Sequence, residues 1–553
     1  MRKAGTILHI SSLPSPYGIG TMGKEAYDFV DFLKASGLSF WQVLPLVPSG
    51  SGNSPYASYS MYAGNPDFID LDRLRRQGLL TLEDIQAYSW GKNPARVDFQ
   101  AVHQGRKALL EKAYQNSKNP LSAVDFDLLT QVEDETEKEE ILEDAELLDG
   151  LKDLAALDGD ENNGEKAAAE QAVYQPVVES VDYDREVARF RQQNQGWVED
   201  YALYMALKER YQQKPWYEWD SEIANREPWA VERCREELRE QMDFWVFVQY
   251  LFYSQWNALK LYANDNGVEM IGDIPIYSFH DSVDVWAGRR YFWLDRKNMP
   301  VKVAGVPPDA FSEDGQRWGN PLYRWDLLED DGYQWWINRI RHNLQLYDWV
   351  RIDHFRGFDQ FYAIDAEEPD AKKGEWCEGP GYDLFKRVKE ELGDVKILAE
   401  DLGVITPSVR RLLEKTGFPG MKVLQFACSG SGNAYLPHNA EENAFMYTGT
   451  HDNDTTLGWL ESGDKKEIAF ARRYFGLNRE EGFNWGLIRG ALGSRCKAAM
   501  IPMQDFLNLG SGDRMNIPAT PEGNWGFRMK PGAVTDSLAE KISVLLECFG
   551  RHS

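Results

Sequence analysis

The chain has 553 residues, 43% of them hydrophobic, which is enough for one large folded unit with insertions. Its formal net charge of −27 would repel nucleic acid and anionic membrane surfaces, so neither is expected as a partner. No apolar run reaches the length of about 18 residues that a membrane-spanning helix requires, and the N-terminus lacks the apolar stretch of a signal peptide.

The cysteine and aromatic content narrows the expected chemistry. The five cysteines are an odd number, lie far apart and form no C-x-x-C pair, which disfavours a disulfide framework and a zinc site. This pattern is typical of a reducing compartment, so we expect a cytoplasmic protein without a metal ion. The 19 tryptophans and 26 tyrosines mildly favour a carbohydrate ligand, because sugar rings stack on aromatic faces, although core packing explains many of them equally well.

Short apolar runs that end in polar or acidic residues recur along the chain and alternate with helix-like stretches. Short buried strands between amphipathic helices indicate a parallel α/β fold, and eight such units indicate a (β/α)8, or TIM, barrel. The predicted strands are 7–10, 40–46, 268–277, 349–354, 395–401, 421–427, 445–452 and 499–506. The predicted helices beside them include 25–36, 244–264, 335–347 and 407–416.

Residues 18–23 match the G-x-G-x-x-G pattern of dinucleotide-binding folds. Pro14 and Pro16 lie between the first strand and these glycines, so the strand does not run directly into the turn. The following strand also ends without an acidic residue that would hold a ribose. We therefore predict a sharp loop that leads into a helix and no nucleotide site.

About 220 residues separate the second and third predicted strands, far more than an ordinary connection contains. The sequence thus predicts barrel strands 1 and 2 in residues 1–70, an inserted, mostly helical subdomain in residues 71–243, and strands 3–8 in residues 244–553. Within the insertion we expect helices at 100–116 and 188–211. Its acidic segment 133–165 is interpreted as a solvated helical arm or a mobile loop, because it lacks the D-x-D-x-D-G order of a calcium loop.

Acidic residues stand at the ends of several predicted strands, where a barrel places its chemistry. Asp353 lies between Arg351 and His354, and Glu400 and Asp452 end two later strands. Glycosyl transfer with retention needs one ionised carboxylate as nucleophile and one protonated carboxyl as acid, and a neighbouring arginine favours the ionised form. A single acidic residue at a strand end is usually a cap or a surface ion pair, but three on one barrel favour a carboxylate-based enzyme.

These segments resemble amylomaltase, family 77 of the glycoside hydrolases and a relative of α-amylase. The likeness runs in order along nearly the whole chain and includes residues 11–20, 41–46, 54–56, 63–66, 272–277, 305–312, 315–321, 514–516 and 523–525. It implies a retaining 4-α-glucanotransferase that moves a segment of an α-1,4-glucan to the 4-OH of glucose or another glucan through a covalent glucosyl-enzyme. Maltooligosaccharides and α-1,4-glucans would be the substrates, and no cofactor is implied.

The resemblance also implies residue roles. Asp353 would be the nucleophile, Glu400 the general acid/base, and Asp452 a third acid that binds sugar hydroxyls beside the reacting carbon. Residues 305–321 would form a loop that covers the glucan like a lid. The implied substrate contacts are Ser54, Tyr56, Asp273, Asp309, Gln316, Trp318, Arg351, His354, His451 and Asn516.

Two features of the sequence depart from the family pattern, and two other functions stay open. Segment 133–165 has no recognised counterpart, and Glu522 stands where some members have a small polar residue. An α-amylase-like hydrolase would share the fold and the intermediate but use water as acceptor. A glucan-binding protein without activity would share the fold alone, and the three intact acidic residues argue against it.

Overall fold

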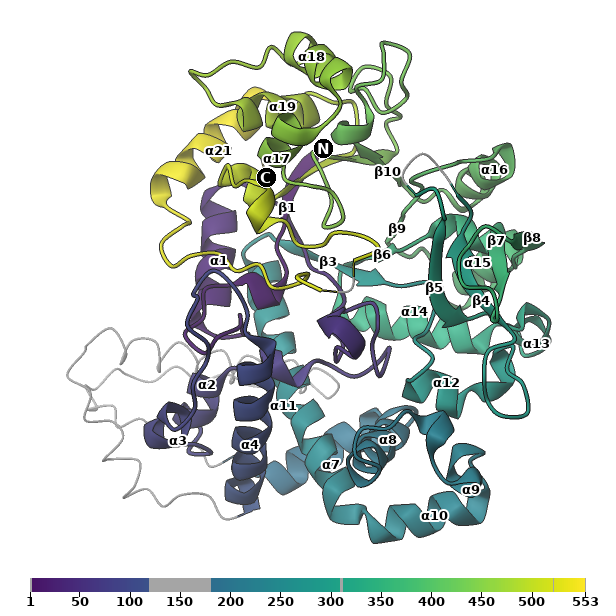
Figure 1. Cartoon of the computed structure of the whole chain (residues 1–553). Coiled ribbons are helices and arrows are strands. Elements are labelled where there is room, and N and C mark those ends of the chain that lie inside the picture. The colour runs from purple at the N-terminus through teal and green to yellow at the C-terminus, as the bar shows by residue number, and fades with distance from the viewer. Residues whose placement is uncertain (1, 119–180, 309–311, 521, 553) are drawn as a thin grey trace, which may run out of the picture.

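The computed structural model describes residues 2–118, 181–308, 312–520 and 522–552. The acidic segment 133–165 and Asp309 therefore lie outside the described residues. Eight strands form one all-parallel sheet in the order β10-β11-β12-β1-β2-β3-β6-β9 (Figure 1). They are β1 (Lys3–Ile7), β2 (Phe40–Gln42), β3 (Glu269–Ile274), β6 (Trp349–Ile352), β9 (Ile397–Ala399), β10 (Gly420–Val423), β11 (Ala444–Tyr447) and β12 (Ala498–Pro502).

The two outer strands of this order also meet. The amide of Ala399 in β9 donates to the carbonyl of Pro419, the residue before β10, at 2.9 Å. A sheet whose first and last strands join is a barrel. The (β/α)8 barrel predicted from the sequence is therefore confirmed.

All eight predicted strands are present, but the first was placed too far along the chain. It was predicted at 7–10, whereas β1 spans Lys3–Ile7 and residues Ile10–Ser12 form a 3-10 turn. Strand β1 pairs with β12 on one side and β2 on the other, and nearly all of its residues are buried. A strand buried on both faces shows no apolar alternation, so the apolar run does not reveal where it ends.

Helices follow the strands and cover the barrel (Figure 1). Helix α16 (Pro407–Thr416) has typical capping residues at both ends. The Thr406 hydroxyl accepts from the Val409 amide at its start, and Gly417 takes the left-handed conformation directly after its last turn. Residues 18–23 form the predicted loop before α1. The other helices around the barrel and its loops are α1 (Lys24–Ala35), α11 (Arg239–Asp265), α12 (Val283–Ala287), α13 (Trp325–Asp330), α14 (Gln334–Leu346), α15 (Gly381–Leu392), α17 (Thr456–Ser462), α18 (Lys465–Tyr474), α19 (Phe483–Leu492), α20 (Met503–Phe506) and α21 (Asp536–Cys548).

Between β2 and β3 the regular elements of the described residues are all helical, and they lie at one side of the barrel (Figure 1). The helix predicted at 188–211 is wrong as a single element: α7 ends at Gln193 and α8 begins at Val198. The Asn194 side chain ends α7, because it donates to the Phe190 carbonyl and accepts from the Trp197 indole. The subdomain bounds 71 and 243 stay a prediction. The helices are α2 (Leu71–Arg76), α3 (Leu82–Gln86), α4 (Phe99–Lys118), α7 (Tyr183–Gln193), α8 (Val198–Arg210), α9 (Ser221–Ala224) and α10 (Pro228–Glu237).

A second, antiparallel sheet that the sequence did not predict lies beside the barrel. Its order is β5-β4-β7-β8, formed by β4 (Lys302–Val306), β5 (Gln316–Pro321), β7 (Gln360–Asp365) and β8 (Gly374–Glu378). Residues 305–321, predicted as a loop, thus begin and end in paired strands. All residues of β8 and all but the last residue of β5 are exposed or partly exposed, so neither strand shows the apolar run that marked the barrel strands.

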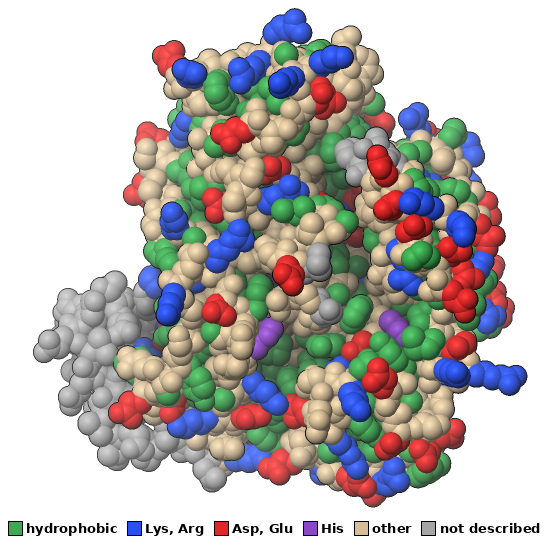
Figure 2. Space-filling view, in the orientation of Figure 1, with side chains coloured by type: hydrophobic (Ala, Val, Ile, Leu, Met, Phe, Trp, Pro, Cys, Tyr) green, Lys and Arg blue, Asp and Glu red, His purple; other side chains and the backbone are tan. Residues whose placement is uncertain are grey.

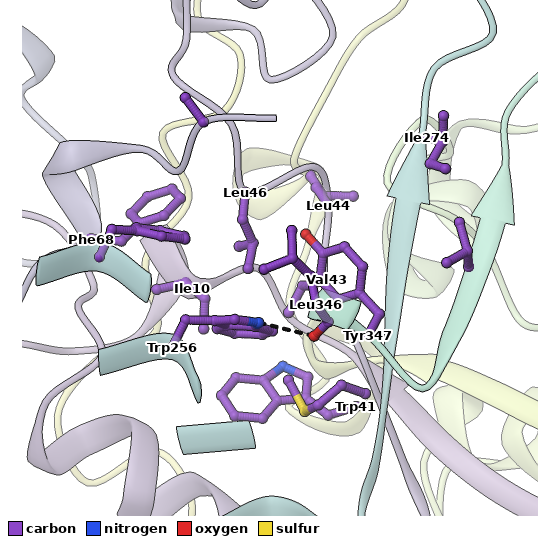
Figure 3. Packing of buried hydrophobic residues seen from close by; sticks show 14 of the residues in the cluster. Ile10, Trp41, Val43, Leu44, Leu46, Phe68, Trp256, Ile274, Leu346 and Tyr347 are labelled. Atoms are coloured by element: carbon purple, nitrogen blue, oxygen red, sulfur yellow. Dashed lines mark hydrogen bonds between the residues drawn. The ribbon is translucent and has the colours of Figure 1, made fainter. Parts of the chain in front are cut away.

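Large side chains pack the barrel wall, and two of its buried tryptophans donate to backbone carbonyls (Figure 3). The Trp41 indole donates to the Leu8 carbonyl at 2.7 Å, and the Trp256 indole donates to the Leu346 carbonyl at 2.9 Å. Because burial leaves no water to replace these partners, each bond fixes a helix or strand against its neighbour. No helix among the described residues is both long and apolar enough to cross a membrane.

Candidate active site

Strand register places the acidic side chains of the predicted site at one rim of the barrel. Ile352 in β6 pairs with Ala399 in β9, so the residues that follow them, Asp353 and Glu400, leave neighbouring strands at the same level. Their backbones continue the ladder, since the Glu400 amide donates to the Ile352 carbonyl at 3.0 Å. Asp273 lies near the end of the adjacent strand β3, opposite Arg351. Parallel strands thus bring together residues that are far apart in the sequence.

Arg351 links two of these carboxylates. Its Nη1 donates to both oxygens of Asp273 at 2.8 and 2.6 Å, and its Nη2 donates to Asp353 at 2.7 Å. Arg351 and Asp273 are buried, whereas the Asp353 side chain is 32% exposed. Charge-assisted hydrogen bonds of this kind are strong, and they leave the second face of Asp353 free for a ligand.

Asp273 was predicted to contact substrate, but its side chain is fully buried. It accepts from the Tyr56 hydroxyl at 2.7 Å as well as from Arg351. Burial, followed by the charge of Asp353, raises the pKa of Asp273, and Arg351 opposes this rise. In this geometry Asp273 holds Arg351 and Tyr56 in place.

An aromatic stack lies beside this network. The rings of Tyr56 and His451 are parallel within 14° at 5.3 Å, and the Tyr56 hydroxyl is 2.9 Å from His451 Nε2. Trp525 packs against both, with centroid distances of 5.8 and 6.1 Å. Ser54 contributes to the turn that presents Tyr56, because its hydroxyl accepts from the Tyr56 amide at 3.2 Å.

Asp452 is held in the loop after β11. One carboxylate oxygen accepts from Asn516 Nδ2 at 2.7 Å, and the other lies 3.4 Å from His451 Nε2. The Arg514 guanidinium donates to the Asp452 carbonyl at 2.7 Å, which fixes its backbone. The Asp452 side chain is 46% exposed. Asp452 therefore presents an accessible carboxylate to the barrel mouth.

The Glu400 carboxyl sits between two backbone amides. Its oxygens accept from the amides of His354 and Leu402, each at 2.7 Å. Burial is the largest cause that raises the pKa of Glu400, to about 8, and the nearby charge of Asp353 adds to it. Arg351 and the two amides act in the opposite direction. Glu400 thus keeps its proton near neutral pH.

His354 takes a strained backbone conformation to make this contact. Its φ of 50° and ψ of 48° lie in the left-handed region, which non-glycine residues rarely adopt, and this turn points its amide at Glu400. Burial lowers the pKa of the His354 ring to about 4, so the imidazole is neutral. The Nε2 atom of His354 is buried without a hydrogen-bond partner. The centroids of the His354 and Trp318 rings lie 4.9 Å apart, with the two rings nearly perpendicular. An unpaired polar atom at this position suits a ligand hydroxyl.

The predicted lid region brings Trp318 and Gln316 to the site on β5. The Trp318 indole donates to Gln316 Oε1 at 3.1 Å, and 38% of Trp318 is exposed. Trp318 also packs near Tyr277 at 6.2 Å. The face in Figure 2 has hydrophobic side chains gathered in a hollow at its centre, with charged side chains spread around it. An exposed aromatic beside the acids provides a surface on which a sugar ring can stack.

Sequence analysis assigned no role to three residues that contact the site. Trp525 and Arg514 lie within sequence motifs shared with the family, so these motifs could have pointed to them. His9 lies two residues before another such motif, residues 11–20, but its position alone did not indicate a role. It lines a cavity of about 20 Å³ together with His451, and burial, followed by the neighbouring His451, lowers the pKa of His9 to about 3. Among the described residues, no group of three or more histidine, cysteine or acidic side chains has the arrangement of a metal site.

The family model described as 4-alpha-glucanotransferase, glycoside hydrolase family 77, matches residues 8–145 and 124–535 of the chain. The chain belongs to this family. A 4-alpha-glucanotransferase of Clostridium butyricum is 42% identical over 98% of this chain and 100% of its own length. One from Thermus thermophilus is 41% identical over 100% of this chain and 99% of its own.

A solved structure agrees with this membership. The amylomaltase of Streptococcus agalactiae, determined in complex with acarbose, superposes with a TM-score of 0.86 and 36% identity, and the match covers both chains completely. The chain therefore has the fold of a family 77 glucanotransferase.

Proposed function

We propose that this chain disproportionates α-1,4-glucans with Asp353 as nucleophile, Glu400 as general acid/base and Asp452 as a third acid. Family 77 enzymes transfer glucan segments with retention, and the residue roles are inferred from the geometry of the rim. The observation that supports these roles best is the contrast between two neighbouring carboxyls. Glu400 has a pKa of about 8, whereas Asp353 is bound to the Arg351 guanidinium. Such a pair provides a proton donor and an ionised nucleophile at the same pH.

The proposed reaction has two steps. Asp353 attacks the anomeric carbon, the glycosidic bond breaks, and Glu400 gives its proton to the departing 4-oxygen. A 4-OH of glucose or another glucan then attacks the same carbon, Glu400 takes the hydroxyl proton, and the bond to Asp353 breaks. Two inversions at one carbon restore its configuration. One glycosidic bond replaces another, so the step needs no cofactor.

The remaining predicted contacts are proposed to hold the sugar being transferred. His354 offers an unpaired Nε2, and Asp452 with Asn516 offers a carboxylate and an amide at the mouth. Trp318 and Tyr56 offer ring faces. Ser54, Gln316, His451 and Asp309 stay proposed contacts, and Arg351 and Asp273 act by fixing Asp353 and Tyr56.

We further propose a preference for glucan acceptors over water. The antiparallel sheet brings Trp318 to the acids, and an aromatic wall on the acceptor path disfavours a reactive water. Glucose is the smallest acceptor proposed, and nucleic acid is not a proposed partner. All five cysteines are free, which suits the cytoplasmic location expected from the sequence.

Incubation of the purified protein with maltotriose alone tests this function. Transfer predicts glucose together with a ladder of longer maltodextrins and no net gain of reducing ends. Rising reducing ends with shorter products only would identify a hydrolase. No change with maltotriose or with longer maltodextrins would support the binding-protein interpretation.

A further inference from the structure

The segment that follows Glu400 is firmly attached only at its start. Asp401 is buried and accepts from the Met421 amide, and Leu402 packs against the barrel core. Beyond Leu402 the chain forms neither helix nor strand before α16, and Gly403 and Val404 are exposed. Within the described part of the chain, the Arg356 guanidinium is the only hydrogen-bond partner of the backbone of residues 403–405, which it reaches at the Val404 carbonyl at 2.7 Å. The position of residues 403–405 therefore depends on Arg356.

Arg356 is itself held firmly. It lies in the 3-10 turn Phe355–Phe358 directly after His354, and only 7% of it is exposed. Its guanidinium lies 4.1 Å from the ring centroid of Trp376 in β8. A cation on an aromatic face, with part of its surface removed from water, is a stable arrangement. Arg356 thus joins the second sheet to the segment after Glu400.

The two amides that bind the Glu400 carboxyl come from the two segments that Arg356 connects. The His354 amide belongs to the turn that carries Arg356, and the Leu402 amide lies two residues before Val404. We propose that Arg356 is a positioning residue that clamps these two segments around Glu400. This inference rests on the proposed acid/base role of Glu400.

The two amides that the clamp positions lower the proton affinity of Glu400. Hydrogen bonds from amides stabilise the ionised carboxylate, and both amides lower the pKa of Glu400 against the effects of burial and Asp353. The other charged or titratable groups around Glu400 are Arg351 in β6, Asp353 directly after β6, Tyr435, and the buried pair of Asp401 with Lys422. Arg356 is not among the largest causes of the shift in the Glu400 pKa, so its removal is expected to act mainly through the position of the Leu402 amide.

The test is the pH dependence of kcat/KM for maltotriose in R356Q, R356K and the wild type. Arg411, exposed on α16, supplies the matched control R411Q. In R356Q the alkaline limb of the kcat/KM profile should move to higher pH by about 0.5–1 unit, because one hydrogen bond to the charged carboxylate is lost. The same loss should lower kcat about tenfold. KM should change less than about twofold, because the amides bind the acid and not the sugar. R356K retains a donor and should lie between R356Q and the wild type.

An unmoved alkaline limb in R356Q, or an equal shift in R411Q, would overturn the inference. If R356Q does not fold, W376L decides: it removes the ring beneath the guanidinium and should move the limb in the same direction, and no shift would refute the clamp. E400Q separates this inference from the proposed function. Normal transfer by E400Q would refute the role of Glu400, whereas an inactive E400Q with an unshifted R356Q would refute the clamp alone.

Discussion

Individual carboxyls at the barrel rim have different surroundings although they lie close together. Arg351 binds Asp353 directly, whereas the partly buried Glu400 lies beside a like charge, which helps to raise its pKa. These environments, and not the residue types, separate a nucleophile from an acid. The same reasoning predicts how each carboxyl responds to substitution and to pH.

Replacing Asp353 with Asn should abolish transfer and leave the fold intact. Asn is nearly isosteric and can still accept from Arg351, but it cannot form the glycosyl ester. We expect transfer from maltotriose to fall by about 10³-fold or more. Near-normal transfer by D353N, with an unchanged circular dichroism spectrum, would show that another residue is the nucleophile.

Glu400 should limit activity on the alkaline side. Its pKa of about 8 predicts that kcat/KM falls above that pH, as the acid loses its proton. Because Asp353 and Glu400 interact, the limb reports a value for the pair. A profile that stays flat to pH 10 would contradict this assignment.

The same shift predicts an effect on stability. The pKa of Glu400 is raised from its ordinary 4.5, so between pH 4.5 and 8 the folded protein binds more protons than the unfolded chain. The contribution of this site to the free energy of unfolding therefore falls as pH rises through that window. The E400Q variant does not titrate in this window, so its free energy of unfolding relative to that of the wild type should rise between pH 5 and pH 7.5, by an amount on the order of 1 kcal/mol, as measured by urea unfolding. A difference between the two proteins that stays constant or falls over this range would contradict the prediction.

Among the secondary-structure elements, the antiparallel sheet shapes one side of the site. Strand β5 pairs with β4, and this pairing holds the Trp318 ring perpendicular to the ring of His354, at 4.9 Å between centroids. The sheet is continuous through β7 to β8, where Trp376 meets Arg356. One sheet thus contains part of the lid region and also contacts Arg356, which binds the segment that follows Glu400.

Removing the Trp318 side chain should open the site to water. In W318A we expect the ratio of transfer to hydrolysis to fall about tenfold, which is what the loss of one aromatic contact of about 1.4 kcal/mol implies. Glucose, longer maltodextrins and reducing ends would be quantified in one assay. The control is W229A, because Trp229 is 54% exposed on α10. An unchanged ratio in W318A would exclude the lid role.

The barrel elements were predictable from the sequence, whereas the second sheet and the aromatic stack were not. Apolar runs that end in acids marked the strands, and parallel packing then requires Asp353 and Glu400 to share a rim. Strand β8 carries no apolar run, since most of its residues are exposed, so nothing marked it as a strand. The stack of Tyr56, His451 and Trp525 depends on how three loops fold toward one another, which periodicity does not encode.

At the scale of the whole molecule, the two chain ends lie near one another (Figure 1). Arg551 is fully buried and donates to the carbonyls of Lys3, Leu492, Ser494 and Cys496 at 2.6–3.0 Å. It therefore ties the last residues to β1 and to the chain that leads into β12. This side chain thus stabilises the barrel rim opposite the active site.

R551A should lower the free energy of unfolding by about 3 kcal/mol, because it leaves several buried carbonyls without a donor. Urea unfolding would measure the loss, and kcat at low temperature should stay close to that of the wild type. R495A is the control: Arg495 is exposed and pairs with Glu442, a surface contact worth less than about 1 kcal/mol. Equal destabilisation by both variants would argue against a closing role for Arg551.

The most direct measurement is mass spectrometry of the E400Q variant after incubation with α-maltosyl fluoride. Fluoride departs without a proton donor, so the first step should proceed, while the second step lacks its base and should be slow. The account predicts a mass increase of one maltosyl group, located on the peptide that contains Asp353. A maltosyl group on a different carboxylate, or turnover of the fluoride with no adduct at any time point, would contradict it.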